Sequence, residues 1–442
     1  MQSPDDREDV VALSPFSFKK MRSDETVPDH ESAVFFLCLG LLLTILAFFF
    51  NEPGEIWSGS IVILTSPANL VTDYFALANI GATLMNAGIM TLTSLVLVLI
   101  TRSKINGAIV AGIFTVAGFS FFGKNLYNSI PIILGVYLYA RVVRLPFNRF
   151  ILQALFGTAL GPLVSEISFN LNLPPAAGHL LGLAAGIVAG FVLPPLSAHF
   201  LRFHQGFNLY NIGFTAGIVG MFFLAVLRGF GIEITTVNIV SSGNNRAFAV
   251  ILYALFIAML LLGLARNRWR LTGYRQLLSQ SGKLATDFVT ISGPGLTLIN
   301  MAFLGILATG YVLAVGGDLN GPVIGGVFTV VGFGAFGKHV WNVWPILAGV
   351  FLANLFNVLE VNATTALLGA LFGTTLAPVA GFYGPVYGIV AGILHMAMVS
   401  NISYLHAGMN LYNNGFSGGF IAAALVPLFD LIKQVIMDHR TR

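Results

Sequence analysis

The chain has 442 residues, of which 56% are hydrophobic and only 9% are charged, and its mean hydropathy is +0.84. Soluble domains carry about 25% charged residues, so a chain this long and this poor in charge cannot cover a water-facing surface. The formal charge of +4 is small and dispersed, which argues against nucleic-acid binding, and the single cysteine, Cys38, excludes a disulfide framework and a cysteine-based metal site.

The first 31 residues differ from the rest. They hold eight acidic residues and four Lys or Arg. They lack the basic start and short apolar core of a cleaved signal peptide. We therefore expect residues 1–31 to form a polar cytoplasmic tail.

After the tail, apolar runs follow one another along the whole chain, and they are continuous rather than alternating, which predicts helices and not barrel strands. The first half contains a short run at 56–66 that we do not expect to cross. Its expected spans are 32–50, 75–101, 107–122, 127–143, 149–167, 176–201 and 207–231. The pair 107–122 and 127–143 could instead form a re-entrant hairpin, which leaves the number of crossings odd.

The chain contains an internal duplication, which is the first feature to look for in a long sequence. Residues 114–131, FTVAGFSFFGKNLYNSIP, match residues 328–345 at ten of eighteen positions, and HQGFNLYNIGFTAG (204–217) matches 406–419 at nine of fourteen. LFGTALGP (155–162) likewise matches LFGTTLAP (371–378). We place the first repeat at 32–240 and the second at 241–442. An odd number of crossings per repeat inverts the second repeat in the membrane.

The distribution of Lys and Arg agrees with inversion if both termini are cytoplasmic. The fold prediction is therefore an all-α integral membrane protein with two inverted-topology repeats of about five to seven helices each, some of them broken. The expected location is a bacterial inner or plasma membrane.

Inverted repeats are typical of transporters and channels, whose solute sites lie where helices break near the middle of the membrane. Each GK stretch offers such a break, with a lysine among Gly, Asn and Pro. An intramembrane ammonium is a functional hypothesis by default, although a lysine that extends to the lipid headgroups is the structural alternative. The substrate-binding candidates from these stretches are Lys124, Lys338, Asn128 and Asn342.

The second repeated motif, HxGxNLYNxGF, offers uncharged donors and acceptors that suit a polar solute, or else a helix-start turn. Its candidates are His204, His406, Asn208, Asn410, Tyr210, Tyr412, Asn211 and Asn413. Asp73 and Asp287 stand at the start of long spans, where we expect helix caps, with coupling to a cation or proton as the alternative. Asn86 and Asn300 lie inside those spans, where we expect bonds between helices, and they are further coupling candidates. Glu166 has no acidic equivalent and is expected in a loop.

The FGK and NLYNxGF motifs of both halves carry a resemblance, over nearly the whole chain, to a family of uncharacterised bacterial polytopic membrane proteins. That resemblance implies no function. A looser likeness is to urea channels, which have two inverted halves, short membrane-inserted helices and a motif like NLYNIGFTAGIVG (208–220). The Leu-Pro and Thr-Pro-Phe signature of that family is not evident here, and this chain is longer.

The sequence thus favours a channel or secondary transporter for a small polar or anionic solute, not an enzyme, with no cofactor and no metal. A proton or a sodium ion is a candidate coupling ion, membrane lipid surrounds the chain, and we expect a homo-oligomer. The alternatives are a membrane-embedded enzyme acting on a lipid, for which clustered His, Asp or Glu are missing, and a membrane scaffold or sensor. No Walker loop is present, so ATP-driven transport is not expected.

Overall fold

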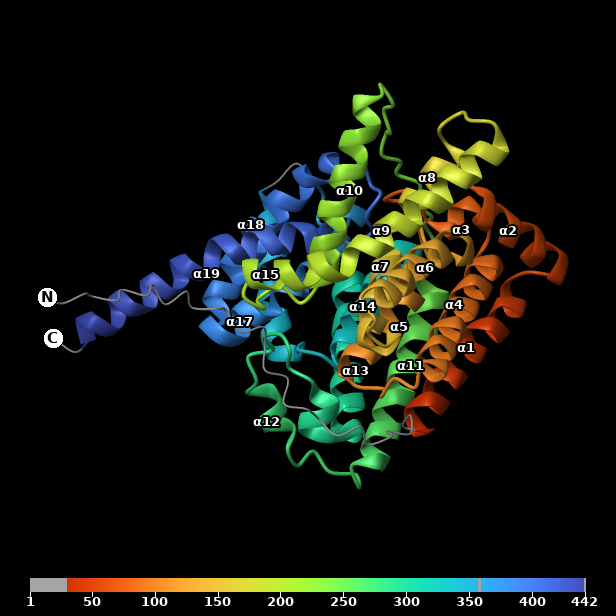
Figure 1. Cartoon of the computed structure of the whole chain (residues 1–442). Helices are drawn as coiled ribbons and strands as arrows, with labels where there is room; N and C mark the ends of the chain where they lie inside the picture. The colour runs from red at the N-terminus through yellow and green to blue at the C-terminus, as the bar shows by residue number, and fades with distance from the viewer. Residues whose placement is uncertain (1–29, 357–358, 441–442) are drawn as a thin grey trace, which may run out of the picture.

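The computed structural model describes residues 30–356 and 359–440, so nearly all of the predicted tail (1–31) lies outside the described residues. The described part of the chain folds into helices, with isolated β-bridges but no extended strand (Figure 1). The helices of the first half are α1 (His30–Phe50), α2 (Pro53–Thr65), α3 (Tyr74–Leu77), α4 (Ile80–Ile100), α5 (Gly107–Phe119), α6 (Leu126–Val142), α7 (Ile151–Gly157), α8 (Gly161–Phe169), α9 (Pro175–Phe203) and α10 (Asn211–Gly229).

The second half repeats this order. Its helices are α11 (Asn245–Arg266), α12 (Tyr274–Leu278), α13 (Phe288–Ala314), α14 (Gly321–Phe333), α15 (Val340–Leu355), α16 (Thr364–Gly373), α17 (Ala377–Tyr383), α18 (Pro385–Ile402) and α19 (Asn413–Arg440). By position in the repeat, α5 corresponds to α14, α6 to α15, α9 to α18 and α10 to α19.

Among the described residues, ten helical segments are long and apolar enough to cross a membrane, five in each half. The helices α5, α6, α14 and α15 are apolar but shorter. A 13-residue helix such as α5 reaches only about 20 Å, less than the roughly 30 Å of a bilayer core. Helix α5 is therefore too short for a full crossing, the re-entrant hairpin at 107–122 and 127–143 stays a prediction, and the number of long spans in each half is odd.

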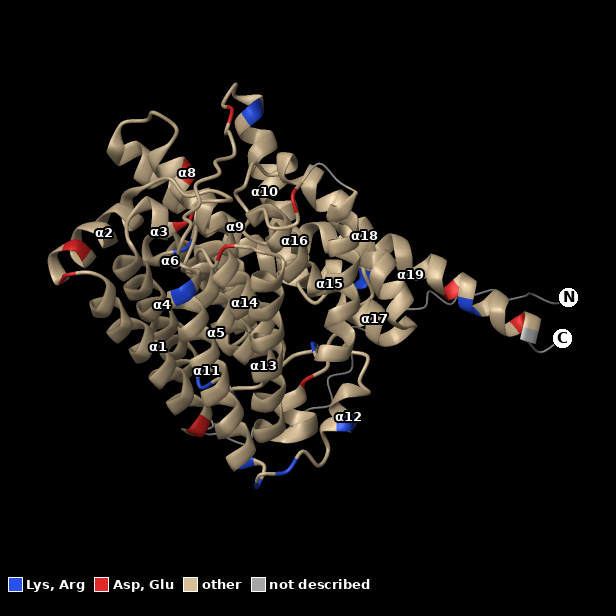
Figure 2. Cartoon of the chain, turned by 180° about the vertical axis from the view of Figure 1, so that it is seen from behind, with Lys and Arg blue, Asp and Glu red and all other residues tan. Residues whose placement is uncertain are grey.

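The outer surface of the bundle suits lipid. On the peripheral helix α1 the apolar side chains of Val34, Leu37, Leu41, Ile45 and Phe48 are exposed. Most Lys, Arg, Asp and Glu positions lie at helix ends and in loops, and the sides of the long helices carry few of them (Figure 2). The fold is that of a multi-pass membrane protein.

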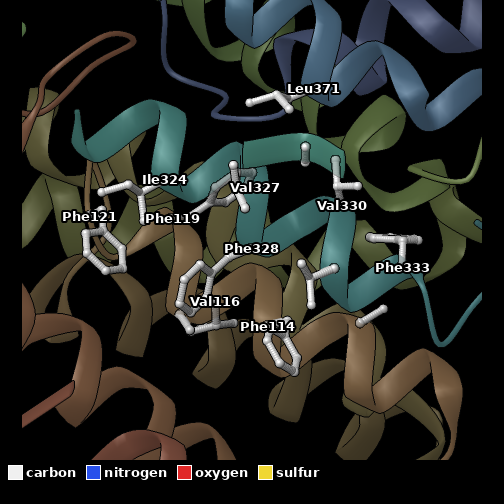
Figure 3. Packing of buried hydrophobic residues seen from close by; sticks show 14 of the residues in the cluster. Phe114, Val116, Phe119, Phe121, Ile324, Val327, Phe328, Val330, Phe333 and Leu371 are labelled. Carbon is white, nitrogen blue, oxygen red and sulfur yellow. The ribbon is translucent and has the colours of Figure 1, made fainter. Parts of the chain in front are cut away.

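Residues that are equivalent by the duplication contact each other. The rings of Phe114 and Phe328 lie 5.9 Å apart between α5 and α14, where Figure 3 shows their side chains together. Tyr210 and Tyr412 lie 4.9 Å apart, and the rings of Phe214 and Phe416 on α10 and α19 lie 6.0 Å apart. A contact between a residue and its own equivalent is the mark of a twofold axis. The two halves are therefore related by a pseudo-twofold axis that runs between α5 and α14 and between α10 and α19.

Close packing at this axis depends on glycine. A Cβ atom added to Gly118 of α5 would lie 2.7 Å from the backbone oxygen of Gly325 on α14. A side chain at this position would push the two helices apart, so Gly118 allows their backbones to touch.

Asp73 and Asp287 are helix caps, the role that the sequence favoured. The Asp287 carboxylate accepts hydrogen bonds from the Thr290 amide (3.2 Å) at the start of its own helix and from the Gly107 amide (3.1 Å) at the start of α5 in the other half. Asp73 accepts from the Phe75 amide (2.9 Å) and faces the Gly321 amide at the start of α14 in the same way. Each repeat therefore caps a helix of the other.

Glu166 corrects one expectation from the sequence. It lies in α8 with 1% of its surface exposed, where its carboxylate accepts a hydrogen bond from Asn170 (2.7 Å), and not in a loop. One helical turn separates these two residues, so a short-range partner satisfies the acid.

We predict that Asp73→Ala and Asp287→Ala each lower the free energy of unfolding by about 1–3 kcal/mol, because each leaves amides at two helix starts without an acceptor. The measurement is the melting temperature of the purified protein in detergent. Glu233→Ala is the control, because Glu233 lies exposed in the segment between the halves. Equal melting temperatures for the cap variants and the control would contradict the role of the caps.

Candidate functional site

The two GK stretches break the chain of helices inside the protein. Helix α5 ends at Phe119 and α6 begins at Leu126, and the residues between them form a turn in which Gly123 has a φ of +71°. The equivalent Gly337 has a φ of +95°, a conformation that favours glycine. Lys124 and Lys338 follow these glycines, and both are fully buried. The hypothesis that these lysines extend to the membrane surface is therefore wrong.

Asn86 and Asn300 hold the two turns. The Asn86 side-chain amide donates to the backbone oxygens of Ser120 (2.8 Å) and Lys124 (2.9 Å). The amide of Asn300 donates to the equivalent oxygens of Gly334 (2.7 Å) and Lys338 (2.8 Å). These bonds satisfy carbonyls that the helix break leaves free, as a water-poor interior requires.

Asn128 and Asn342 also serve the turns. Asn128 accepts from the Asn125 amide (3.0 Å) and donates to the Gly123 oxygen (3.0 Å). Asn342 repeats this arrangement with the Gly337 oxygen, at 2.9 Å. Both side chains bond to backbone groups next to the lysines, at the start of the following helix. They therefore position the lysines.

The Lys338 ammonium is held by the protein. It donates to the Tyr210 hydroxyl (2.6 Å) and to the Thr374 hydroxyl (2.6 Å). It also lies over the rings of Tyr210 (4.6 Å to the centroid) and Phe333 (5.1 Å), as a cation–π contact requires. Tyr210 comes from the first repeat, so the partner of this lysine crosses the pseudo-twofold axis.

The Lys124 ammonium has a different environment, although the surrounding residues are equivalent. It lies 5.3 Å from the centroid of the Phe119 ring and has no hydrogen-bond partner. The buried hydroxyls of Tyr412 and Thr115 have only each other as partners. Among the described residues, no carboxylate forms an ion pair with Lys124 or Lys338.

Six aromatic rings form a cluster beside the two lysines. Tyr412 contacts Phe119 and Tyr210 contacts Phe333, both at 4.7 Å between ring centroids, as the pseudo-symmetry demands. Phe372 contacts Phe119 at 5.6 Å, and the equivalent Phe156 contacts Phe333 at 5.7 Å. We refer to these six residues as the aromatic cluster: Phe119, Phe156, Tyr210, Phe333, Phe372 and Tyr412.

In the second motif, each histidine is paired with an asparagine. A ring nitrogen of His204 bonds to the side-chain oxygen of Asn211 at 3.0 Å, and His406 bonds to Asn413 at the same distance. No group of His, Cys, Asp or Glu that could hold a metal ion occurs in the described residues.

The remaining asparagines of this motif reach across the axis. The Asn208 amide donates to the Gly415 oxygen (2.9 Å), and the Asn410 amide donates to the Gly213 oxygen (3.3 Å). These contacts fix α10 against α19. The motif therefore brings its tyrosines to the centre and uses its other polar side chains as supports.

Two cavities of nearly equal volume approach the aromatic cluster. The Asn211 cavity has a volume of about 270 Å³ and is lined by Phe156, Tyr210, Phe333 and Tyr412, among others. The Asn413 cavity has a volume of about 260 Å³ and reaches Phe372. Their walls are largely equivalent by the duplication, in the pairs Leu152 and Leu368, Phe156 and Phe372, Ala198 and Ser400, Leu209 and Leu411, Asn211 and Asn413, and Leu284 and Leu70.

Sequence reasoning missed three polar residues of the centre: Thr115, Thr158 and Thr374. Thr158 and Thr374 are equivalent, and the hydroxyl of each donates to a backbone oxygen three residues earlier. They stand within the repeated LFGT segments, so their retention in both halves was a usable signal. Thr115 stands in the repeated FTV segment.

The two halves of the chain also appear in comparisons with known proteins. No curated protein and no solved structure matches the chain. The looser likeness to urea channels thus stays a prediction. The family described as "Protein of unknown function (DUF1576)" matches residues 52–229 and 266–431, one segment in each half. Since these segments cover most of the sequence, the chain belongs to the DUF1576 family.

Proposed function

We propose that this protein is a channel or secondary transporter for a small polar or anionic solute, with its pathway between the two repeats. The observation that carries the proposal is the pair of equivalent cavities that approach one aromatic cluster. A solute pathway needs access from both sides of the membrane and a barrier between them, and a pseudo-twofold pair of cavities with buried rings at the axis has this arrangement.

Inversion of the repeats is part of the proposal. Five long spans in each half are an odd number, so the second half starts on the opposite side of the membrane from the first. The pseudo-twofold axis then lies in the membrane plane, and the two cavities face opposite sides. We place both termini in the cytoplasm because the clusters of Lys and Arg favour that side.

The cavity walls favour a solute with hydrogen-bonding groups. The polar residues in the walls are uncharged, and they include Gln153, Ser197 and Asn211 in one cavity and Thr365, Ser400 and Asn413 in the other. The buried ammonium groups of Lys124 and Lys338 contact rings of the aromatic cluster. A neutral wall followed by a buried ammonium suits a small anion or a carbonyl compound better than a cation.

We predict that cysteines at positions 198 and 400 are labelled from opposite sides of the membrane. These positions are equivalent by the duplication, each lines one cavity, and both are exposed. The background is Cys38→Ser, because Cys38 is the one native cysteine. A membrane-impermeant maleimide is applied to intact cells and to inside-out vesicles that carry Ala198→Cys or Ser400→Cys. Labelling of both positions from the same side would contradict inversion.

We predict that proteoliposomes carrying the protein show solute-dependent flux. The panel contains small neutral amides, polyols and anions, and the readouts are light scattering and internal pH. Lys338→Met should reduce this flux by about tenfold or more, because it removes charge-assisted hydrogen bonds at the centre. Lys104→Met is the control, because Lys104 is an exposed loop lysine. Flux of no solute by wild-type protein, or equal flux in Lys338→Met and Lys104→Met, would contradict the proposed pathway.

A further inference from the structure

Three buried polar groups lie near one end of α5. The Lys124 ammonium has no hydrogen-bond partner, and the hydroxyls of Thr115 and Tyr412 have only each other as partners. Thr115 lies one helical turn before Phe119, and the Phe119 ring contacts both the Lys124 ammonium (5.3 Å) and the Tyr412 ring (4.7 Å). We define Lys124, Thr115 and Tyr412 as the Lys124 half-site.

The equivalent groups in the other repeat are satisfied by the protein. Lys338 donates to Tyr210 and Thr374, and the Thr329 hydroxyl donates to the Gly325 oxygen (2.9 Å) of its own helix. We define Lys338, Tyr210, Thr374 and Thr329 as the Lys338 half-site. Buried polar groups are rarely left unpaired, so a buried ammonium without a partner, beside two hydroxyls that have only each other, indicates a place for a ligand, whereas the equivalent ammonium is satisfied.

We propose that the Lys124 half-site binds one small monovalent anion, of the size of chloride, nitrate or formate. This inference rests on the proposed transport function and names the solute class for it. In the Lys338 half-site the Tyr210 and Thr374 hydroxyl oxygens accept hydrogen bonds from the ammonium. The Lys338 half-site therefore represents the form in which protein groups take the place of the anion.

The chemistry of the half-site selects an anion. The ammonium can only donate, and the Thr115–Tyr412 pair keeps one hydroxyl hydrogen that is not used between the two residues. No described carboxylate supplies a counter-charge, and an isolated charge in a low-dielectric interior is costly. The edges of aromatic rings carry partial positive charge, which also favours an anion.

The site also limits the size and charge of the anion. One ammonium neutralises one negative charge, so a dianion such as sulfate would leave a buried net charge. The buried position of all three donors requires the ligand to lose its water, which favours weakly hydrated ions.

The test measures anion binding to the purified protein in detergent, independently of transport. Sodium gluconate is replaced by sodium chloride, nitrate, formate or sulfate at constant ionic strength, and the melting temperature is followed against anion concentration. At least one monovalent anion should raise the melting temperature with saturation, and sulfate should not. Lys124→Met should abolish the rise, which separates site binding from general salt effects.

One matched pair, Thr115→Val and Thr329→Val, tests the asymmetry of the half-sites. Thr115→Val and Tyr412→Phe should each weaken apparent affinity by about tenfold, as expected for a hydrogen bond to a charged group. Thr329→Val, which alters the equivalent threonine, should leave affinity within about twofold. Equal weakening in Thr115→Val and Thr329→Val would overturn the assignment to the Lys124 half-site.

Failure of this inference differs from failure of the transport function. If no monovalent anion stabilises wild-type protein while a neutral solute shows flux, the anion site is overturned and transport stands. If an anion binds as described and no solute shows flux, the site stands and the transport function is overturned.

Discussion

A helix that breaks inside a membrane must satisfy its freed backbone groups within the protein, and the centre of this structure depends on that constraint. Lipid offers no hydrogen bonds, so the GK turns depend on side-chain amides, and Asn86 and Asn300 each satisfy two of their carbonyls. The asparagines fix the turns, and the turns place Lys124 and Lys338 among buried rings. The charged groups at the centre thus depend on uncharged amides one helix away.

The two repeats complete each other and do not form separate units. Asp287 caps α5 of the first repeat, and Tyr210 of the first repeat binds Lys338 of the second. Asn208 and Asn410 likewise donate across the pseudo-twofold axis. Because helix starts and the Lys338 ammonium of one repeat find their hydrogen-bond partners in the other, neither repeat is expected to fold to this structure alone. A solute bound at the axis would contact both repeats.

The sequence predicts the framework of this fold well and its cross-repeat contacts poorly. Composition, the duplication and the Gly-rich breaks indicate a helical membrane protein, two repeats and a special role for the GK turns. Asp73 and Asp287 occur at equivalent positions in both halves. Each follows a threonine at the start of a long apolar run, a pattern that predicts a helix cap. The pairing of Lys338 with Tyr210, 128 residues apart, and the position of Thr115 depend on how helices from different halves cross, which no local pattern encodes. Glu166 was misplaced because an acid in an apolar helix has a partner, Asn170, that hydropathy does not reveal.

Two half-sites built from the same residue types differ in their contacts. Lys, Tyr, Phe and Thr occupy equivalent positions in both half-sites. Residue type alone therefore does not decide which lysine is paired with protein hydroxyls and which is left without a partner. The segment that joins the repeats breaks this balance because it occurs once in the chain. Its residues Val237 and Ile239 pair with Val71 and Asp73 beside the Asn413 cavity (Val71 amide to Val237 oxygen, 2.6 Å), and Val237 is part of the wall of that cavity. Among the residues that line the Asn211 cavity, none comes from this linker. The linker therefore makes the surroundings of the two cavities unequal, although the residues at the centre are equivalent.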